Sequence, residues 1–207
     1  MVKFYVFVLT LGMMFGGLTL SAQNQLGSAP PDFKGRLLLA LSDADMAASA
    51  YIDGKLLAPN GKDELSVISF REHSSAFTKA VVTATNSVVG PPASLAVSSD
   101  GKYAIVIETR GPRPERQPEA TFKDLAKGHA ITVIDLSNPS QPQVVQRLNP
   151  PGEQPLSVCI NPAGDLVAIA YTTVKIRQSP LVLYRFRRGK LSAPFGPVIP
   201  NWGKGDD

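Results

Sequence analysis

Two short stretches decide the fold, SSDGKY at Ser98–Tyr103 and NPAGDL at Asn161–Leu166, because the sequence around them is written twice. Aligning Gly101 with Gly164 sets the two copies 63 positions apart (164 − 101). The same offset pairs Pro92 with Pro155, Ser94 with Ser157 and Val97 with Ile160. Each stretch stands between two short apolar runs. The repeat therefore predicts one local structure that is built at least twice.

The polar residues of both stretches are typical of a tight turn between antiparallel strands. Serine or asparagine bonds the backbone at the turn entrance, and proline pre-sets φ at the next position. Glycine supplies a positive φ without steric cost. A fainter copy at Asp53-Gly54-Lys55 places Gly54 47 positions before Gly101 (101 − 54). We interpret seven residues as structural turn residues rather than ligands: Asp53, Gly54, Asp100, Gly101, Asn161, Pro162 and Gly164.

Short apolar runs follow each turn, rich in valine, isoleucine and leucine and bounded by Gly, Pro, Asn or Asp. Such runs are strand signals. The third run of each unit reads LSVISF, ITVIDL and LVLYRF at 65–70, 131–136 and 181–186. Four strands make one unit, which predicts units at 46–84, 92–149 and 155–200. The best helical candidate, 119–128, is long enough for two turns at most.

The composition agrees with a folded chain of many turns. Among 207 residues, 43% are hydrophobic and 18% charged, with 18 prolines and 17 glycines. This balance predicts a buried core and argues against disorder. The net charge of +4 is spread along the chain in mixed signs, which gives no nucleic-acid signature.

The first segment reads as a secretory signal peptide. Lys3 precedes an apolar run from Phe4 to Leu20 and then small residues, so we expect cleavage after Ala22. The expected divisions are a signal peptide at 1–22, a flexible lead-in at 23–35, the repeat units within 36–200 and a polar tail at 201–207. We expect a periplasmic or secreted protein with no stable membrane span after cleavage.

The repeats resemble the YVTN/lactonase-like bacterial β-propellers of the WD40-like superfamily. The resemblance covers Arg36–Pro200 and rests on the two hairpins and on VIDLSNPSQPQVV at Val133–Val145. It implies an all-β fold: a partial β-propeller of about three four-stranded antiparallel blades after a signal peptide. It also implies that Arg36–Leu41 is an outer strand that completes the last blade.

Three blades do not close a ring, since closed propellers have about four to eight. The chain is then either a fragment of a longer protein or closes by forming an oligomer. Of the two, we favour a truncated or split reading frame.

The resemblance implies that the loop after the second strand of a blade shares one face with the loop between blades. It places an insertion at 110–129 beside the segment 149–155. Loops on a rigid scaffold commonly carry function, although the composition of this insertion favours a solvated, partly disordered loop. The candidate ligand- or partner-binding residues are Glu108, Arg110, Arg113, Arg116 and His129.

No residue cluster in the sequence has metal-ligand spacing, and we expect neither a metal nor a cofactor. The single cysteine, Cys159, lies between apolar neighbours, which predicts a buried thiol. Strand alternation at 184–187 predicts one face with Tyr184 and Phe186 and another with Arg185 and Arg187.

Lactonases of this class carry histidine and acidic residues at the channel-facing strand starts. Here those positions hold Ala93, Ser94, Leu156 and Ser157. We therefore expect a binding module whose partner is an unidentified protein or small molecule and not a nucleic acid. The alternatives are a propeller enzyme of lactonase or cyclase type and a structural surface-layer module.

Overall fold

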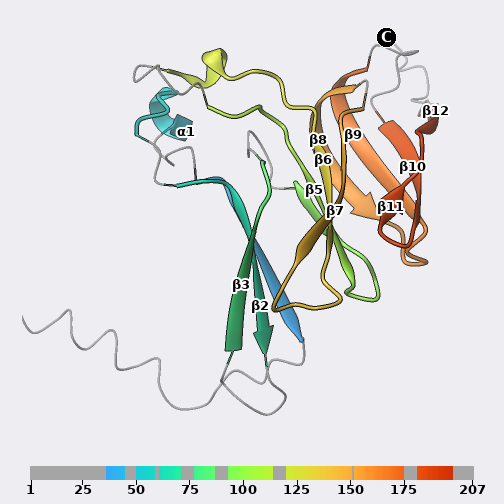
Figure 1. Ribbon diagram of the computed structural model, residues 1–207. Helices are drawn as coiled ribbons and strands as arrows, with labels where there is room; N and C mark the ends of the chain where they lie inside the picture. The colour runs from blue at the N-terminus through green and yellow to red at the C-terminus, as the bar shows by residue number, and fades with distance from the viewer. Residues whose placement is uncertain are drawn as a thin grey trace, which may run out of the picture.

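The computed structural model describes residues 36–44, 50–58, 61–70, 77–86, 93–113, 120–150, 152–174 and 181–197 (Figure 1). Within these residues the chain forms three antiparallel sheets, each built from strands that are neighbours in sequence. The all-β prediction is confirmed. We call the three the first, middle and third sheets, in chain order.

The first sheet has the order β1-β2-β3, with β1 at Leu37–Ser42, β2 at Glu64–Phe70 and β3 at Phe77–Thr83. The middle sheet has the order β4-β5-β6-β7, with strands at Leu95–Val97, Tyr103–Ile107, Ile131–Asp135 and Gln143–Leu148. The third sheet runs β11-β10-β9-β8, and β12 also pairs with β10. Its strands β8 to β12 span Gly152–Ile160, Leu166–Val174, Leu181–Arg187, Lys190–Leu191 and Phe195–Pro197. Two short helical turns, α1 at Ala50–Asp53 and η1 at Phe122–Asp124, complete the described elements.

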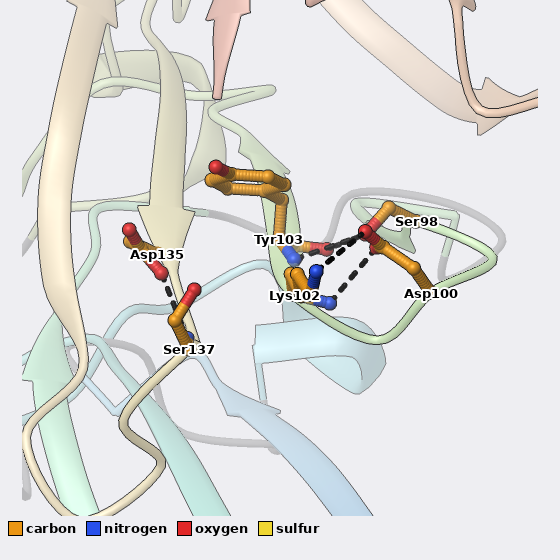
Figure 2. A network of polar contacts seen from close by, with 6 residues as sticks. All are labelled: Ser98, Asp100, Lys102, Tyr103, Asp135 and Ser137. Carbon is orange, nitrogen blue, oxygen red and sulfur yellow. Dashed lines mark hydrogen bonds and ion pairs between the residues drawn. The ribbon is translucent and has the colours of Figure 1, made fainter. Parts of the chain in front are cut away.

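The turn at SSDGKY closes the hairpin between β4 and β5. The Ser98 amide donates to the Tyr103 carbonyl at 2.9 Å, and Gly101 has a φ of +69°. Figure 2 shows the side chains that support this backbone. Asp100 Oδ1 accepts from the Ser98 hydroxyl at 2.6 Å and from the Lys102 amide at 3.1 Å. The first of these bonds holds the pKa of Asp100 below its usual value.

The turn at NPAGDL closes the equivalent hairpin between β8 and β9. The Asn161 amide donates to the Leu166 carbonyl at 2.9 Å, and Gly164 has a φ of +72°. In this copy one asparagine side chain accepts the backbone hydrogen bonds that a serine and an aspartate side chain accept in the other copy. Asn161 Oδ1 accepts from the amides of Asp165 at 3.0 Å and Leu166 at 2.9 Å.

The middle sheet is buried on both faces. Ile105, Ile107, Ile131 and Val133 pack on the third sheet, against side chains that include Ile169 and Tyr184. The opposite face, with Ala104, Val106, Ile134 and Leu136, packs on Leu65 and Val67 of the first sheet. This double burial explains why β5 is a continuous apolar run and why successive residues of β6 are buried rather than alternating. The hydrophobic effect therefore holds three sheets face to face in chain order.

The first strands of the middle and third sheets run side by side. Ala93 and Ser157 form a parallel bridge, and the Val158 amide donates to the Ala93 carbonyl at 3.0 Å. Meanders that stack face to face, with their first strands adjacent, have the arrangement of propeller blades. The described residues form a partial β-propeller.

The first sheet differs from the prediction. β1 does not extend the last blade but pairs with β2, from Leu37↔Ser69 to Ser42↔Glu64. The leucines at alternate positions of β1 pack on the apolar cluster between the first and middle sheets. This packing holds β1 in the first sheet. The expected hairpin at Asp53 and Gly54 is also absent: Asp53 ends α1, and Gly54, at a φ of +77°, leads away from it.

The prediction for Cys159 is wrong, because this thiol is exposed. Its neighbour Val158 faces the core between the middle and third sheets, so alternation along β8 turns Cys159 to the opposite face. The alternation predicted for β10 is confirmed, since Tyr184 and Phe186 are buried while Arg185 and Arg187 are exposed.

Candidate functional site

The insertion at 110–129 leaves the middle sheet after β5 and returns to β6 at the end of the molecule opposite the hairpin turns (Figure 1). As predicted, it lies beside the segment that opens β8. The Gln154 amide donates to the Gly128 carbonyl at 2.9 Å, and the Thr109 hydroxyl donates to the Pro155 carbonyl at 2.7 Å. The insertion is thus bonded directly to the third sheet.

The insertion is also docked on the first unit. The Leu56 amide donates to the Ala120 carbonyl at 2.9 Å, and the Phe122 amide donates to the Gly54 carbonyl at 3.0 Å. A small apolar cluster forms around these bonds, made of Ala50, Leu56, Ala120 and Leu125 with Phe122 against it. The described parts of the insertion are therefore packed structure, and the solvated-loop interpretation does not hold for them.

The turn η1 within the insertion carries its own cap. The amide and the hydroxyl of Thr121 both bond Asp124 Oδ2, at 2.8 Å and 2.9 Å, while Thr121 Oγ1 accepts from the Lys123 amide. This is a reciprocal capping box. The bonds from Thr121 keep the pKa of Asp124 below its usual value. The expected helix at 119–128 is reduced to this single turn.

Glu108 braces the base of the insertion. It is buried, and its Oε2 accepts from the amides of His129 at 3.2 Å and Ala130 at 3.3 Å. The segment that returns to β6 passes so close that a Cβ on Gly128 would overlap the Glu108 carbonyl oxygen. The Glu108 carboxylate therefore positions the base of the insertion.

The two described arginines of the insertion act as internal ties. Arg113 Nη1 donates to the Leu56 carbonyl at 2.8 Å, and Arg110 Nη1 donates to the Leu125 carbonyl at 3.4 Å. Arg110 Nε is buried and has no hydrogen-bond partner among the described residues. The third predicted arginine, Arg116, lies outside the described residues.

His129 lies at the junction with the third sheet. Its Nδ1 is 3.3 Å from the Gly152 carbonyl oxygen, so Nδ1 carries the hydrogen of that bond. The Glu108 carboxylate accepts from the backbone amide of His129, and no hydrogen bond joins it to the His129 ring among the described residues. The structure therefore does not bring these two predicted residues together as an acid–base pair.

Next to His129, an ion pair joins the insertion to the third sheet. Lys127 Nζ lies 2.8 Å from Glu153 Oε2, with side chains that are 48% and 20% exposed. Thr172 Oγ1, on β9, lies 3.3 Å from the Glu153 carbonyl and 3.1 Å from Gln154 Oε1. One hydroxyl hydrogen can serve only one of these acceptors at a time.

Gln154 has a φ of +54°, a conformation that is costly for a residue with a side chain. Strain of this kind at a polar surface is often retained for function. We call Lys127, His129, Glu153, Gln154 and Thr172 the loop-face cluster. It offers a cation, a carboxylate, an imidazole, an amide and a hydroxyl within one junction between two sheets.

The candidate list from the sequence overlaps this cluster only at His129. The other four residues could have been inferred from the predicted adjacency of the insertion and 149–155, but no single motif marks them. Among the described residues, no group of three or more His, Cys, Asp or Glu side chains is placed to hold a metal ion.

Sequence reasoning also missed a buried carboxylate below α1. Asp63 accepts from the amides of Ala44 and Asn86, both at 3.0 Å, and so ties three segments of the first unit together. These two partners are backbone groups, so the Asp63 carboxylate helps to hold the first unit together.

No family model matches the chain, and no curated protein matches it. Among solved structures, the chain is similar to the periplasmic gluconolactonase PpgL of Pseudomonas aeruginosa. The two share 14% identity at a TM-score of 0.44, over 66% of this chain. The match spans 35% of the length of that protein. In the part of the chain that the structure describes, no helix is long and apolar enough to cross a membrane.

Proposed function

We propose that this protein is an exported binding module that holds its partner, a protein or a small polar molecule, on the loop-face cluster. The observation that carries the proposal is the docking of the insertion onto both neighbours. A loop tied to the first unit at Leu56 and to the third sheet at Gln154 offers its polar groups in a fixed arrangement. Groups that are already fixed lose little conformational entropy on binding.

The chemistry of the cluster supports a polar partner. Lys127 and Glu153 present opposite charges side by side at the surface, and the amide of Gln154 both donates and accepts. A surface of this kind suits a chain or molecule that carries donors and acceptors close together, such as a peptide segment or a polyhydroxylated compound. The signal-like segment before residue 23 supports export.

Site-specific photocrosslinking in the source organism tests the proposal. A photoreactive residue at Ala126, which is exposed beside the cluster, should give discrete adducts. The same residue at Ser140, exposed in the turn at the opposite end of the middle sheet, is the matched control and should give none. The Lys127→Glu substitution should abolish the Ala126 adducts, because it sets two carboxylates side by side. Equal adducts from both positions, or none from Ala126, would contradict the proposal.

Export has a separate readout. Amino-terminal sequencing of the purified mature chain should begin at Gln23, and a chain that retains Met1 would contradict cleavage.

A further inference from the structure

The two sheet–sheet interfaces inside the chain use equivalent residues. In the middle sheet, the face toward the third sheet carries Ile131 and Val133, paired across to Ile107 and Ile105. We call this side of a sheet its forward face. The side toward the first sheet carries Thr132, Ile134 and Leu136, and we call it the receiving face. Each internal interface joins one forward face to the receiving face of the next sheet.

The third sheet has a forward face that meets no other sheet among the described residues. The offset of 63 places Ala168 and Ala170 at the positions of Ile105 and Ile107, and these pair with Leu183 and Leu181. All four are apolar, as are their buried counterparts in the middle sheet. Cys159 belongs to this face as well, since its counterpart Ala96 (159 − 63) packs against the core between the middle and third sheets.

The first sheet has a receiving face that is likewise left without a sheet among the described residues. Ser66, Ile68 and Phe70 stand where the middle sheet has Thr132, Ile134 and Leu136. The cross-strand pairs agree, since Ile68 pairs with Leu38 as Ile134 pairs with Ala104. Leu38 is 46% exposed there. The counterpart of Leu38 in the middle sheet, Ala104, is fully buried, so the exposure of Leu38 indicates a missing neighbour over this part of the face.

From this equivalence we infer closure by an oligomer, the alternative to the truncated reading frame that the sequence favoured: the forward face of the third sheet packs on the receiving face of the first sheet of a second copy of the chain. The new contact continues the interface that the chain already makes twice within itself. Two copies joined head to tail at both ends hold six sheets (2 × 3), which lies within the range of about four to eight blades that close a propeller. Head-to-tail interfaces form a closed ring when the rotation between copies closes, here with two-fold symmetry.

Sedimentation equilibrium of the purified chain tests the inference. The wild-type chain should sediment at twice its own mass. Leu183→Asp on one face and Ile68→Asp on the other should each reduce this to one chain mass. Val144→Asp is the matched control: this valine on β7 is 42% exposed and lies on the outer strand, so dimerisation should be unchanged.

Mixing separates a head-to-tail ring from a face-to-face pair. The Leu183→Asp chain keeps an intact receiving face and the Ile68→Asp chain keeps an intact forward face, so an equal mixture should recover species of two chain masses. In a dimer made by two copies of one face, one variant would stay dimeric alone and the mixture would recover nothing.

Cys159 gives a readout that needs no disruptive variant. The partner's first sheet should cover this thiol, so its alkylation should be slow in the wild-type chain and should accelerate severalfold when dilution separates the copies. In the Ile68→Asp variant alkylation should also be fast, although Ile68 lies at the other end of the chain. A wild-type chain that stays at one chain mass at every concentration, with Cys159 alkylated rapidly, would overturn the inference.

Discussion

Replacing Gly128 with alanine would place a methyl group inside the backbone of the neighbouring strand extension. The added Cβ would overlap the Glu108 carbonyl oxygen and would lie 2.7 Å from the Thr109 carbonyl carbon. Both are backbone atoms of a buried segment, so neither can move aside as a flexible side chain would. The Gly128 amide also donates to the Thr109 carbonyl at 3.0 Å, and its carbonyl accepts from Gln154.

The expected cost follows from these contacts. Overpacking a tight site costs about 1–3 kcal/mol, and each hydrogen bond that the displaced backbone loses adds about 1 kcal/mol. We expect Gly128→Ala to lower the free energy of unfolding by about 3 kcal/mol, measured by urea denaturation followed by circular dichroism. Gly111→Ala is the matched control, because the nearest atom to its new Cβ is the Ala126 side chain at 3.3 Å.

Gly111→Ala should therefore cost under about 1 kcal/mol. Equal effects of the two substitutions would refute the reasoning, since they would show that the segment that returns to β6 does not press on Glu108 and Thr109. A loss of unfolding free energy that is confined to Gly128→Ala supports the docked geometry at the base of the insertion.

Three further predictions test the interior and the turns. Tyr171 and Tyr184 share a buried hydroxyl–hydroxyl hydrogen bond of 2.9 Å. Changing either residue to Phe should lower the free energy of unfolding by about 1 kcal/mol, and the double change should lower it by less than the sum. Strict additivity would show that the two hydroxyls are not coupled. Thr132 Oγ1 is buried with no hydrogen-bond partner among the described residues, so Thr132→Val should raise the melting temperature, and a lower value would reveal a partner for that hydroxyl. The bond from Ser98 lowers the pKa of Asp100, so the carboxylate adds stability above its unfolded pKa and loses it as the pH falls through the lower folded pKa. The difference in unfolding free energy between wild type and Asp100→Ala should shrink as the pH falls from about 5 to about 2. Its size should be under about 1 kcal/mol, because the Asp100 side chain is half exposed. A difference that grows on acidification would contradict the lowered pKa of Asp100.

The all-β fold and two of the three units could be predicted because their information is local. The turns at Gly101 and Gly164 need a positive φ, and that requirement is visible in the residues themselves. The alternation at 184–187 likewise follows from strand geometry. Face-to-face stacking was implied by the resemblance to propellers, in which each unit buries its apolar faces against its neighbours.

The first unit could not be predicted in the same way. Asp53-Gly54-Lys55 has the residues of a hairpin, yet Gly54 there ends a helical turn, because its neighbour Leu56 is buried in the cluster under the insertion. That cluster depends on residues more than sixty positions away (120 − 56), which no local pattern records. The exposure of Cys159 was missed for a related reason: an apolar run shows that a strand is buried on some face but not which residues face the core.

The candidate site was predicted at the level of segments and not of side chains. The adjacency of the insertion and 149–155 followed from the resemblance to propellers. Charge alone then suggested the arginines as ligands, whereas Arg113 ties the insertion to Leu56 and Glu108 braces its base. The ion pair between Lys127 and Glu153 could be recognised only once the structure placed the two segments side by side.

Hydrogen–deuterium exchange of the insertion tests most directly the claim that it is a docked platform. The amides of Gly111, Phe122, Gly128 and Gln154 donate to carbonyls at 2.9–3.0 Å across the insertion and its two neighbours. Protection of these amides well above the rates of an unstructured peptide is the predicted result, and it should fall in Gly128→Ala but persist in Gly111→Ala. Exchange at the rates of an unstructured peptide in the wild-type chain would contradict the docked insertion, and with it the fixed surface on which the proposed function rests.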